Sequence, residues 1–311
     1  MSDRFSAPLS RRGALKCMAW AGTGVLWAVS GGIPRSFGLD GAAQAATAGG
    51  FSFVQISDSH IGFKQEANPD VAGTLSEAIA RINAMPVPPA FVIHTGDITH
   101  LSKPAQFDLA AEVLKEIKVG PVHYVPGEQD VLDGDGQGYL SRFGQGAKGS
   151  GWYSFDYGGV HFLALSNVAD LKPGGLGLLG ETQLAWIEAD LAPLSAETPI
   201  VVMAHIPLWP AYAEWGWGTD DAARALGFMR RFGSVTVLNG HIHQIMQKIE
   251  GNIVFHTALA TAYPIPAPGT APMPGPLKVP AEELRRRIGL CSVAVQAGPG
   301  PLALTDQALA S

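Results

Sequence analysis

The chain has 311 residues, enough for one large domain or two small ones with a sizeable core. Hydrophobic residues make up 47% and charged residues 15%, a balance that excludes disorder over the body of the chain. The formal net charge is -6, and Lys and Arg form no block outside the extreme N-terminus. This argues against a dedicated DNA- or RNA-binding surface but leaves a small nucleotide substrate open.

The first 50 residues differ from the rest and are typical of an export signal. Residues 10–16, SRRGALK, precede a weakly apolar run over 17–29 and a small-residue tract that reaches Ala43-Gln44-Ala45. The paired arginines resemble the twin-arginine export motif, with Ala14 where that motif more often has Phe. We therefore expect a twin-arginine signal peptide over 1–45, the export machinery as a partner, and a periplasmic or otherwise exported mature protein. An amphipathic N-terminal helix that stays attached is the alternative.

Two cysteines are present, Cys17 and Cys291. Because Cys17 would leave with the signal, the mature protein would keep a single thiol and no internal disulfide. Its fold must then be held together by the core and by any bound metal.

From residue 51 onward, short β-type apolar runs alternate with segments of helical period. Strands are predicted over 51–57, 90–95, 119–125, 200–204 and 234–238, and helices over 69–85, 103–117, 181–191 and 220–232. Two hairpins interrupt this alternation, with strands over 151–157 and 160–166 and over 244–250 and 253–257. The mixture favours an α/β fold of two packed mixed sheets flanked by helices over a single doubly wound sheet.

One domain is predicted over 51–262, followed by an extension over 263–311 that packs on the same domain. Residues 263–280 are Pro-rich and are expected to cross the surface as an extended strap. A short helix over 281–287 and a strand over 290–296 are expected beyond this strap.

Metal-ligand residue types directly follow five of the predicted strands. Hard divalent cations prefer carboxylate oxygens and imidazole nitrogens, and the carboxyl ends of strands meet at one edge of a sheet. Two such residues spaced by one position on extended chain point to the same side. The sequence therefore predicts a metal site built from Asp58-Ser59-His60, Gly96-Asp97, Gly127-Glu128-Gln129-Asp130, His205 and Gly240-His241-Ile242-His243.

This ordered set resembles the signature of the calcineurin-like metallophosphoesterases: D-x-H, G-D, G-N-H-D/E, a lone His and G-H-x-H. The resemblance implies an αββα sandwich, two metal ions from among Fe, Mn and Zn, and in-line attack on phosphorus by a metal-bound hydroxide. It implies that Asp97 bridges the two metals. The first metal would be held by Asp58, His60 and His243, and the second by Glu128, His205 and His241.

The third motif departs from the family pattern at two positions. Glu128 replaces an Asn, so the site would hold three carboxylates instead of two, attract phosphate less and tolerate trivalent iron better. Gln129 replaces the His that helps protonate the leaving group, and an amide cannot deliver that proton near neutral pH. Because a general acid contributes about 10²–10⁴-fold, we expect a preference for good leaving groups, or a substitute acid such as His100. Asp130 would support residue 129 by family pattern; a turn-capping role over 131–133 is the alternative.

Other aromatic and histidine residues have two readings. Trp209, Tyr212, Trp215 and Trp217 lie just after His205 and form either a substrate wall or a packing plug against the strap. The remaining histidines in strand-like runs are interpreted as structural: His94, His123, His161 and His256.

The sequence is thus interpreted as a metal-dependent phosphohydrolase that cleaves a small phosphodiester or phosphomonoester, with leaving-group protonation expected to be impaired by Gln129. A metal- or ligand-binding module of the same fold, with little hydrolytic activity, is the alternative that Gln129 favours. Redox or oxygen chemistry on bound iron is a third reading, since fold resemblance alone does not select a function.

Overall fold

The computed structural model describes residues 25–30, 33–38, 50–172, 174–296 and 302–310. The twin-arginine motif and the cleavage site near Ala45 lie outside these residues, so the signal peptide and the domain boundaries stay predictions. Strands β1 (Val25–Ser30) and β2 (Ile33–Gly38), which the sequence analysis did not predict, pair antiparallel as a separate two-stranded sheet.

Eleven further strands form two larger sheets within the described residues. The five-stranded sheet contains β3 (Phe51–Ile56), β4 (Val92–His94), β5 (Val122–Tyr124), β12 (Gly289–Val295) and β13 (Ala303–Ala308). The six-stranded sheet contains β6 (Tyr153–Tyr157), β7 (Val160–Ala164), β8 (Ile200–Ala204), β9 (Val235–Asn239), β10 (Gln247–Glu250) and β11 (Ile253–Thr257).

Both sheets are mixed. Their strand orders are β13-β12-β3-β4-β5 and β10-β11-β9-β8-β7-β6. Strands β3, β4 and β5 pair in parallel, as do β7, β8, β9 and β11, whereas β6, β10, β12 and β13 join through antiparallel ladders.

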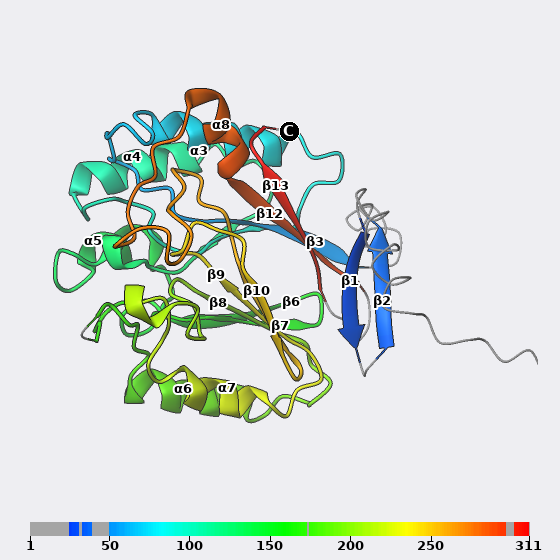
Figure 1. Ribbon diagram of the computed structural model, residues 1–311. Helices are drawn as coiled ribbons and strands as arrows, with labels where there is room; N and C mark the ends of the chain where they lie inside the picture. The colour runs from blue at the N-terminus through cyan, green and yellow to red at the C-terminus, as the bar shows by residue number, and fades with distance from the viewer. Residues whose placement is uncertain (1–24, 31–32, 39–49, 173, 297–301, 311) are drawn as a thin grey trace, which may run out of the picture.

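Helices cover both outer faces of the packed sheets, giving four layers (Figure 1). Helices α3 (Val71–Asn83), α4 (Pro104–Leu114), α5 (Gln137–Phe143) and α8 (Ala281–Arg287) lie on the five-stranded sheet. Helices α6 (Glu181–Leu191) and α7 (Ala222–Met229) lie on the six-stranded sheet. This confirms the predicted α/β architecture of two packed mixed sheets flanked by helices. No helix in the described ranges combines the length and apolar character needed to cross a bilayer.

Three apolar layers hold the sandwich together, one under each set of helices and one between the sheets. The middle layer is rich in aromatic rings: Phe53 and Phe91 stack at 5.0 Å between centroids, and Phe162 meets both edge-on.

Local sequence signals determine where two of the helices begin. Asp70 caps α3 by accepting a hydrogen bond from Gly73 N at 2.9 Å, and α4 begins at Pro104, where a missing N–H has no cost.

The predicted elements match the observed ones in order; most are shorter than predicted, and β9 and β12 are each shifted by one residue. Helices α6 and α8 and strands β8 and β11 have the predicted bounds. Helix α5 and strand β13 were not predicted. The expectation that the Pro-rich strap crosses the surface is wrong for its first three residues, because Tyr263, Pro264 and Ile265 are buried.

Candidate metal centre

Five ligand-bearing loops meet at one edge of the sandwich. Three follow β3, β4 and β5 of one sheet, and two follow β8 and β9 of the other, so the site straddles the seam between the sheets. Backbone hydrogen bonds fix neighbouring loops: Asp58 N donates to Gly96 O at 3.0 Å, and His60 N donates to Asp97 O at 2.9 Å. The carboxyl ends of parallel strands in both sheets thus position one site.

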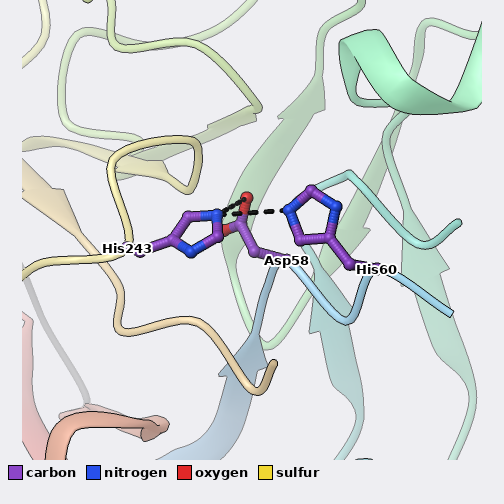
Figure 2. Close-up of side chains that lie close together, drawn as sticks. All are labelled: Asp58, His60 and His243. Atoms are coloured by element: carbon purple, nitrogen blue, oxygen red, sulfur yellow. Dashed lines mark hydrogen bonds and ion pairs between the residues drawn. The ribbon is translucent and has the colours of Figure 1, made fainter. Parts of the chain in front are cut away.

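The first ligand group consists of Asp58, His60 and His243 (Figure 2). His243 Nε2 lies 3.3 Å from Asp58 Oδ1 and 3.2 Å from His60 Nε2. All three side chains are buried, and their donor atoms lie within 4.8 Å of one another. Two ring nitrogens and a carboxylate oxygen therefore converge on a point that a single cation can occupy.

The second ligand group consists of Glu128, His205 and His241. Glu128 Oε2 lies 2.8 Å from His205 Nε2, and Glu128 Oε1 lies 3.1 Å from His241 Nδ1. Asp97 stands between the two groups, with Oδ2 at 3.6 Å from His60 Nε2 and 3.5 Å from His205 Nε2. One carboxylate oxygen thus faces a histidine of each group.

The histidine tautomers suit metal ligation. Nδ1 of His243 faces Tyr263 O at 2.5 Å, and Nδ1 of His205 faces Thr95 O at 2.7 Å. A carbonyl oxygen only accepts, so each Nδ1 donates its proton outward and aims Nε2 at the centre. Although His205 Nε2 lies close to Glu128, it has no partner in hydrogen-bond geometry among the described residues. His205 Nε2 is therefore placed to bind a cation rather than to donate a hydrogen bond to the nearby carboxylate.

The pKa shifts of the buried groups at the centre also indicate that a positive charge is favoured there. Burial, together with the neighbouring Glu128 carboxylate, raises the pKa of Asp97 well above its usual range. Burial lowers the pKa of His205, but Asp97 and Glu128 outweigh it and raise that pKa above its ordinary value. In the metal-free protein, a proton on His205 therefore partly neutralises the Asp97 and Glu128 carboxylates, as a bound metal ion would. The residues present fit a dinuclear metal centre.

The backbone at these loops is unusual. Five of the proposed ligands have left-handed φ angles: Asp58 (52°), His60 (43°), Asp97 (52°), His241 (71°) and His243 (49°). Such φ values are uncommon for residues other than glycine and cost free energy, so they persist only where the surrounding structure enforces them. Their concentration at one site indicates that the loops are shaped for ligand geometry.

Asp130 anchors two of the ligand loops. Its carboxylate accepts hydrogen bonds from the backbone N–H groups of Ile98, Thr99 and Gly127 at 2.8–3.0 Å, and from Thr99 Oγ1 at 2.9 Å. It therefore ties the loop of Asp97 to the loop of Glu128, and its hydrogen bonds go neither to Gln129, as the family pattern predicted, nor to 131–133. The backbone N–H of Gln129 instead orients Asp97, donating to Oδ1 at 2.8 Å.

A pocket of about 410 Å³ opens over the metal centre. Gln129 and His100 line it beside the ligands, and His100 Nδ1 lies 3.4 Å from His60 Nδ1. Among the described residues that line it, none is Lys or Arg. Its upper wall is apolar and comes from three segments far apart in sequence: Leu171, Trp215, Trp217, Tyr263, Ile265, Pro274 and Pro276.

Tyr263 is a site residue that the sequence reasoning missed. Its ring stacks on His60 at 4.9 Å between centroids, its carbonyl holds His243, and it lines the pocket. It begins the Pro-rich strap, which therefore forms part of the site.

The aromatic segment after His205 serves in part as a substrate wall and in part as packing. Trp215 and Trp217 line the pocket, and Trp217 also packs near Ile265 of the strap. Trp209 lies in the core under α6 and α7.

The chain is similar to known proteins in both sequence and fold. The family model described as calcineurin-like phosphoesterase matches residues 51–245. A probable cyclic nucleotide phosphodiesterase of Rhodopseudomonas palustris is 25% identical over 218 residues, covering 68% of this chain and 79% of that protein. A glycerophosphodiester phosphodiesterase of Enterobacter lignolyticus is 24% identical over 227 residues, covering 68% and 78%. A crystal structure of a dimetal phosphatase from Danio rerio has a TM-score of 0.61 at 16% identity, covering 82% and 98%, and shares the fold.

Proposed function

Because the chain belongs to the calcineurin-like phosphoesterase family, we propose that it hydrolyses a small phosphoester at a dinuclear metal centre. The observation that carries this proposal is the position of Asp97, whose Oδ2 faces both ligand groups at 3.5–3.6 Å. Two divalent cations, of Fe, Mn or Zn, would lower the pKa of a water molecule and neutralise charge that develops at phosphorus. Their ligands would be Asp58, His60, Asp97, Glu128, His205, His241 and His243.

Two side chains that line the pocket, Gln129 and His100, are the candidates to assist departure of the leaving group. The Gln129 amide can donate a hydrogen bond to a phosphoryl oxygen but cannot release a proton. If His60 ligates through Nε2, its Nδ1–H donates to His100 Nδ1, which leaves His100 with a proton on Nε2. His100 is thus the candidate proton donor, and its limited acidity favours substrates whose leaving group needs little protonation.

The charge of the pocket and of the metal centre favours a phosphodiester over a phosphomonoester. A diester carries one negative charge and a monoester close to two at neutral pH. Three carboxylates in the centre and the absence of Lys and Arg among the described lining residues favour the lower charge. Two relatives described above, which are phosphodiesterases by name, support the same choice.

Metal content and turnover together test the proposal. We expect the metal-loaded protein to hold two metal ions in the dinuclear centre and to hydrolyse an aryl phosphodiester faster than the matched aryl phosphomonoester. Elemental analysis and a phosphoester panel, run before and after chelation, give both quantities. Two bound metals without turnover of any ester would instead select the binding module that Gln129 favours.

Trp215 supplies an aromatic face on the pocket wall. Because an aromatic pair contributes about 0.5–1.5 kcal/mol beyond burial, we expect Trp215→Ala to lower kcat/KM for an aryl phosphodiester roughly three- to tenfold. The value for a small dialkyl ester should change little. Trp215→Phe, which keeps an aromatic ring, is the matched control and should retain most of the preference. An equal loss for both esters would show that Trp215 only supports the fold.

A further inference from the structure

A second cluster of metal-ligand side chains lies outside the dinuclear centre, between the two sheets. His256 on β11, Cys291 on β12 and Asp306 on β13 place their donor atoms within 4.8 Å of one another. The sequence analysis interpreted His256 as structural and Cys291 only as a lone thiol. The cluster shares no residue with the dinuclear centre, so the inference drawn from it does not depend on the proposed function.

Strand register explains why these three residues meet. Cys291 and Asp306 stand directly opposite each other in the antiparallel β12–β13 pair, so their side chains share one face. His256 pairs with Leu238, which belongs to the apolar layer between the sheets, so the imidazole faces the opposite sheet. His256 Nε2 consequently lies 3.0 Å from Asp306 Oδ1. The cluster joins the six-stranded sheet to the five-stranded one.

Burial makes uncompensated polar groups costly at this position. Cys291 and the His256 side chain are 0% exposed, and the Asp306 side chain is 18% exposed. Burial and the adjacent Asp306 carboxylate raise the pKa of the Cys291 thiol. A divalent cation would instead favour the Cys291 thiolate over the thiol, because ligation displaces the thiol proton. One such cation, a thiolate, a carboxylate and a neutral imidazole sum to zero charge, the least costly state in an apolar layer.

We propose that His256, Cys291 and Asp306 bind a third metal ion, of the zinc type, that pins the two sheets together. Thiolate, imidazole and carboxylate are all zinc ligands. Zinc bond lengths of about 2.0–2.3 Å put neighbouring donors roughly 3.3–3.7 Å apart at a tetrahedral angle. Because the donor atoms all lie within 4.8 Å of one another, ligation needs side-chain shifts of at most about 1 Å, and the partly exposed Asp306 gives the ion a route in.

Two glutamines can complete the surroundings of this ion. Gln247 Nε2 lies 3.1 Å from His256 Nδ1. A flip of that amide would let its oxygen accept the Nδ1 proton and leave Nε2 free for the metal. Gln55 stands opposite Cys291 on β3, and its Oε1 is buried without a hydrogen-bond partner in the described part of the chain. The Gln55 amide nitrogen donates to Thr95 Oγ1 and Asn239 O, so the row Asp306, Cys291, Gln55 contains one amide oxygen that is free to accept on the face of the sheet that carries the thiol.

Cobalt substitution of the full chain tests the third site. Thiolate-to-Co²⁺ charge transfer absorbs in the near ultraviolet, and the dinuclear centre has only oxygen and nitrogen donors, so the band reports Cys ligation alone. We expect the band in the wild type and in Cys17→Ser, where Cys291 is the only thiol, and its loss on adding Zn²⁺ in excess of all three sites. Cys291→Ser should lose the band while keeping the weaker visible absorption of Co²⁺ in the dinuclear centre.

The wild type and Cys17→Ser decide the question even if Cys291→Ser does not fold. Absence of the band in Cys17→Ser would overturn the proposal and leave the cluster as a hydrogen-bonded contact between the sheets. A band that survives in Cys291→Ser would overturn it as well, because Cys17 would then be the ligand.

Discussion

Asp97→Asn is expected to reduce the metal bound in the dinuclear centre from two ions to at most one and to lower kcat/KM for any phosphoester by about 10³-fold or more. The carboxylate stands between both ligand groups, and the amide keeps one oxygen but loses the negative charge that two cations share. Loss of a metal's charge stabilisation, several kcal/mol at the transition state, corresponds to at least three factors of ten in rate. Elemental analysis and steady-state kinetics on the same preparation measure both effects.

The stability of the metal-free variant separates loss of metal from loss of fold. Burial and Glu128 raise the pKa of Asp97, so its ionised form opposes folding when no cation is present. This cost is absent at low pH and appears as the pH rises through the raised pKa. At neutral pH, Asp97→Asn should therefore melt no lower than the wild type without metal, yet gain less on adding metal. A metal-free melting temperature that falls by many degrees would mean that Asp97 is a packing residue.

The order of the ligand motifs could be predicted because each one follows a strand whose apolar run is visible in the sequence. The strand fixes the position of Asp58 or His205 at the carboxyl edge, and parallel pairing brings those edges together. No local pattern, however, shows that a loop adopts a left-handed φ. The His60 backbone is held by its hydrogen bond to Asp97 O on the neighbouring loop, and the His241 backbone by its hydrogen bond to Asp58 Oδ1 across the seam between the sheets.

The elements that were not predicted depend on contacts between distant segments. Helix α5 lies next to a Gly-rich stretch with a weak helical signal, and it forms where Tyr139 and Phe143, spaced by four residues, bury against the layer under α4. Strand β13 has the sequence ALTDQA, which has little intrinsic β-propensity and gains its ladder from β12. Register between β12 and β13 also creates the Cys291–Asp306 pair, which the linear sequence separates by 15 positions.

The contacts that the Pro-rich strap makes also could not be predicted from the sequence. Its composition excludes helices and ladders, as predicted, but says nothing about what it covers. The Tyr263 carbonyl binds His243 Nδ1, a contact between residues 20 positions apart, and Ile265 and Pro276 close the pocket wall. A segment read as a surface connection therefore orients a proposed metal ligand and shapes the space for substrate.

Gln129→His is expected to raise kcat/KM for a dialkyl phosphodiester by about 10²-fold, with little change for an aryl diester. Gln129 lines the pocket beside Glu128, and its main-chain contacts do not depend on its side chain. Its N–H donates to Asp97 Oδ1, and its carbonyl oxygen accepts from Ser102 Oγ at 2.7 Å and from Thr99 Oγ1 at 3.4 Å. The substitution therefore adds an imidazole without disturbing the loop. A poor alkoxide leaving group gains from a proton donor, whereas a phenolate with a low pKa does not.

The pH profile and a matched control identify the source of that gain. An imidazolium acid should make kcat/KM for the dialkyl ester fall as the pH rises through the histidine's pKa, about 6.5 when unperturbed. Gln65→His places the same ring elsewhere on the pocket wall and should give no gain. Equal stimulation by both variants would indicate a general effect of added positive charge. No gain from Gln129→His, with two metals bound, would mean that protonation of the leaving group is not what limits this centre, and that His100 or solvent already supplies the proton.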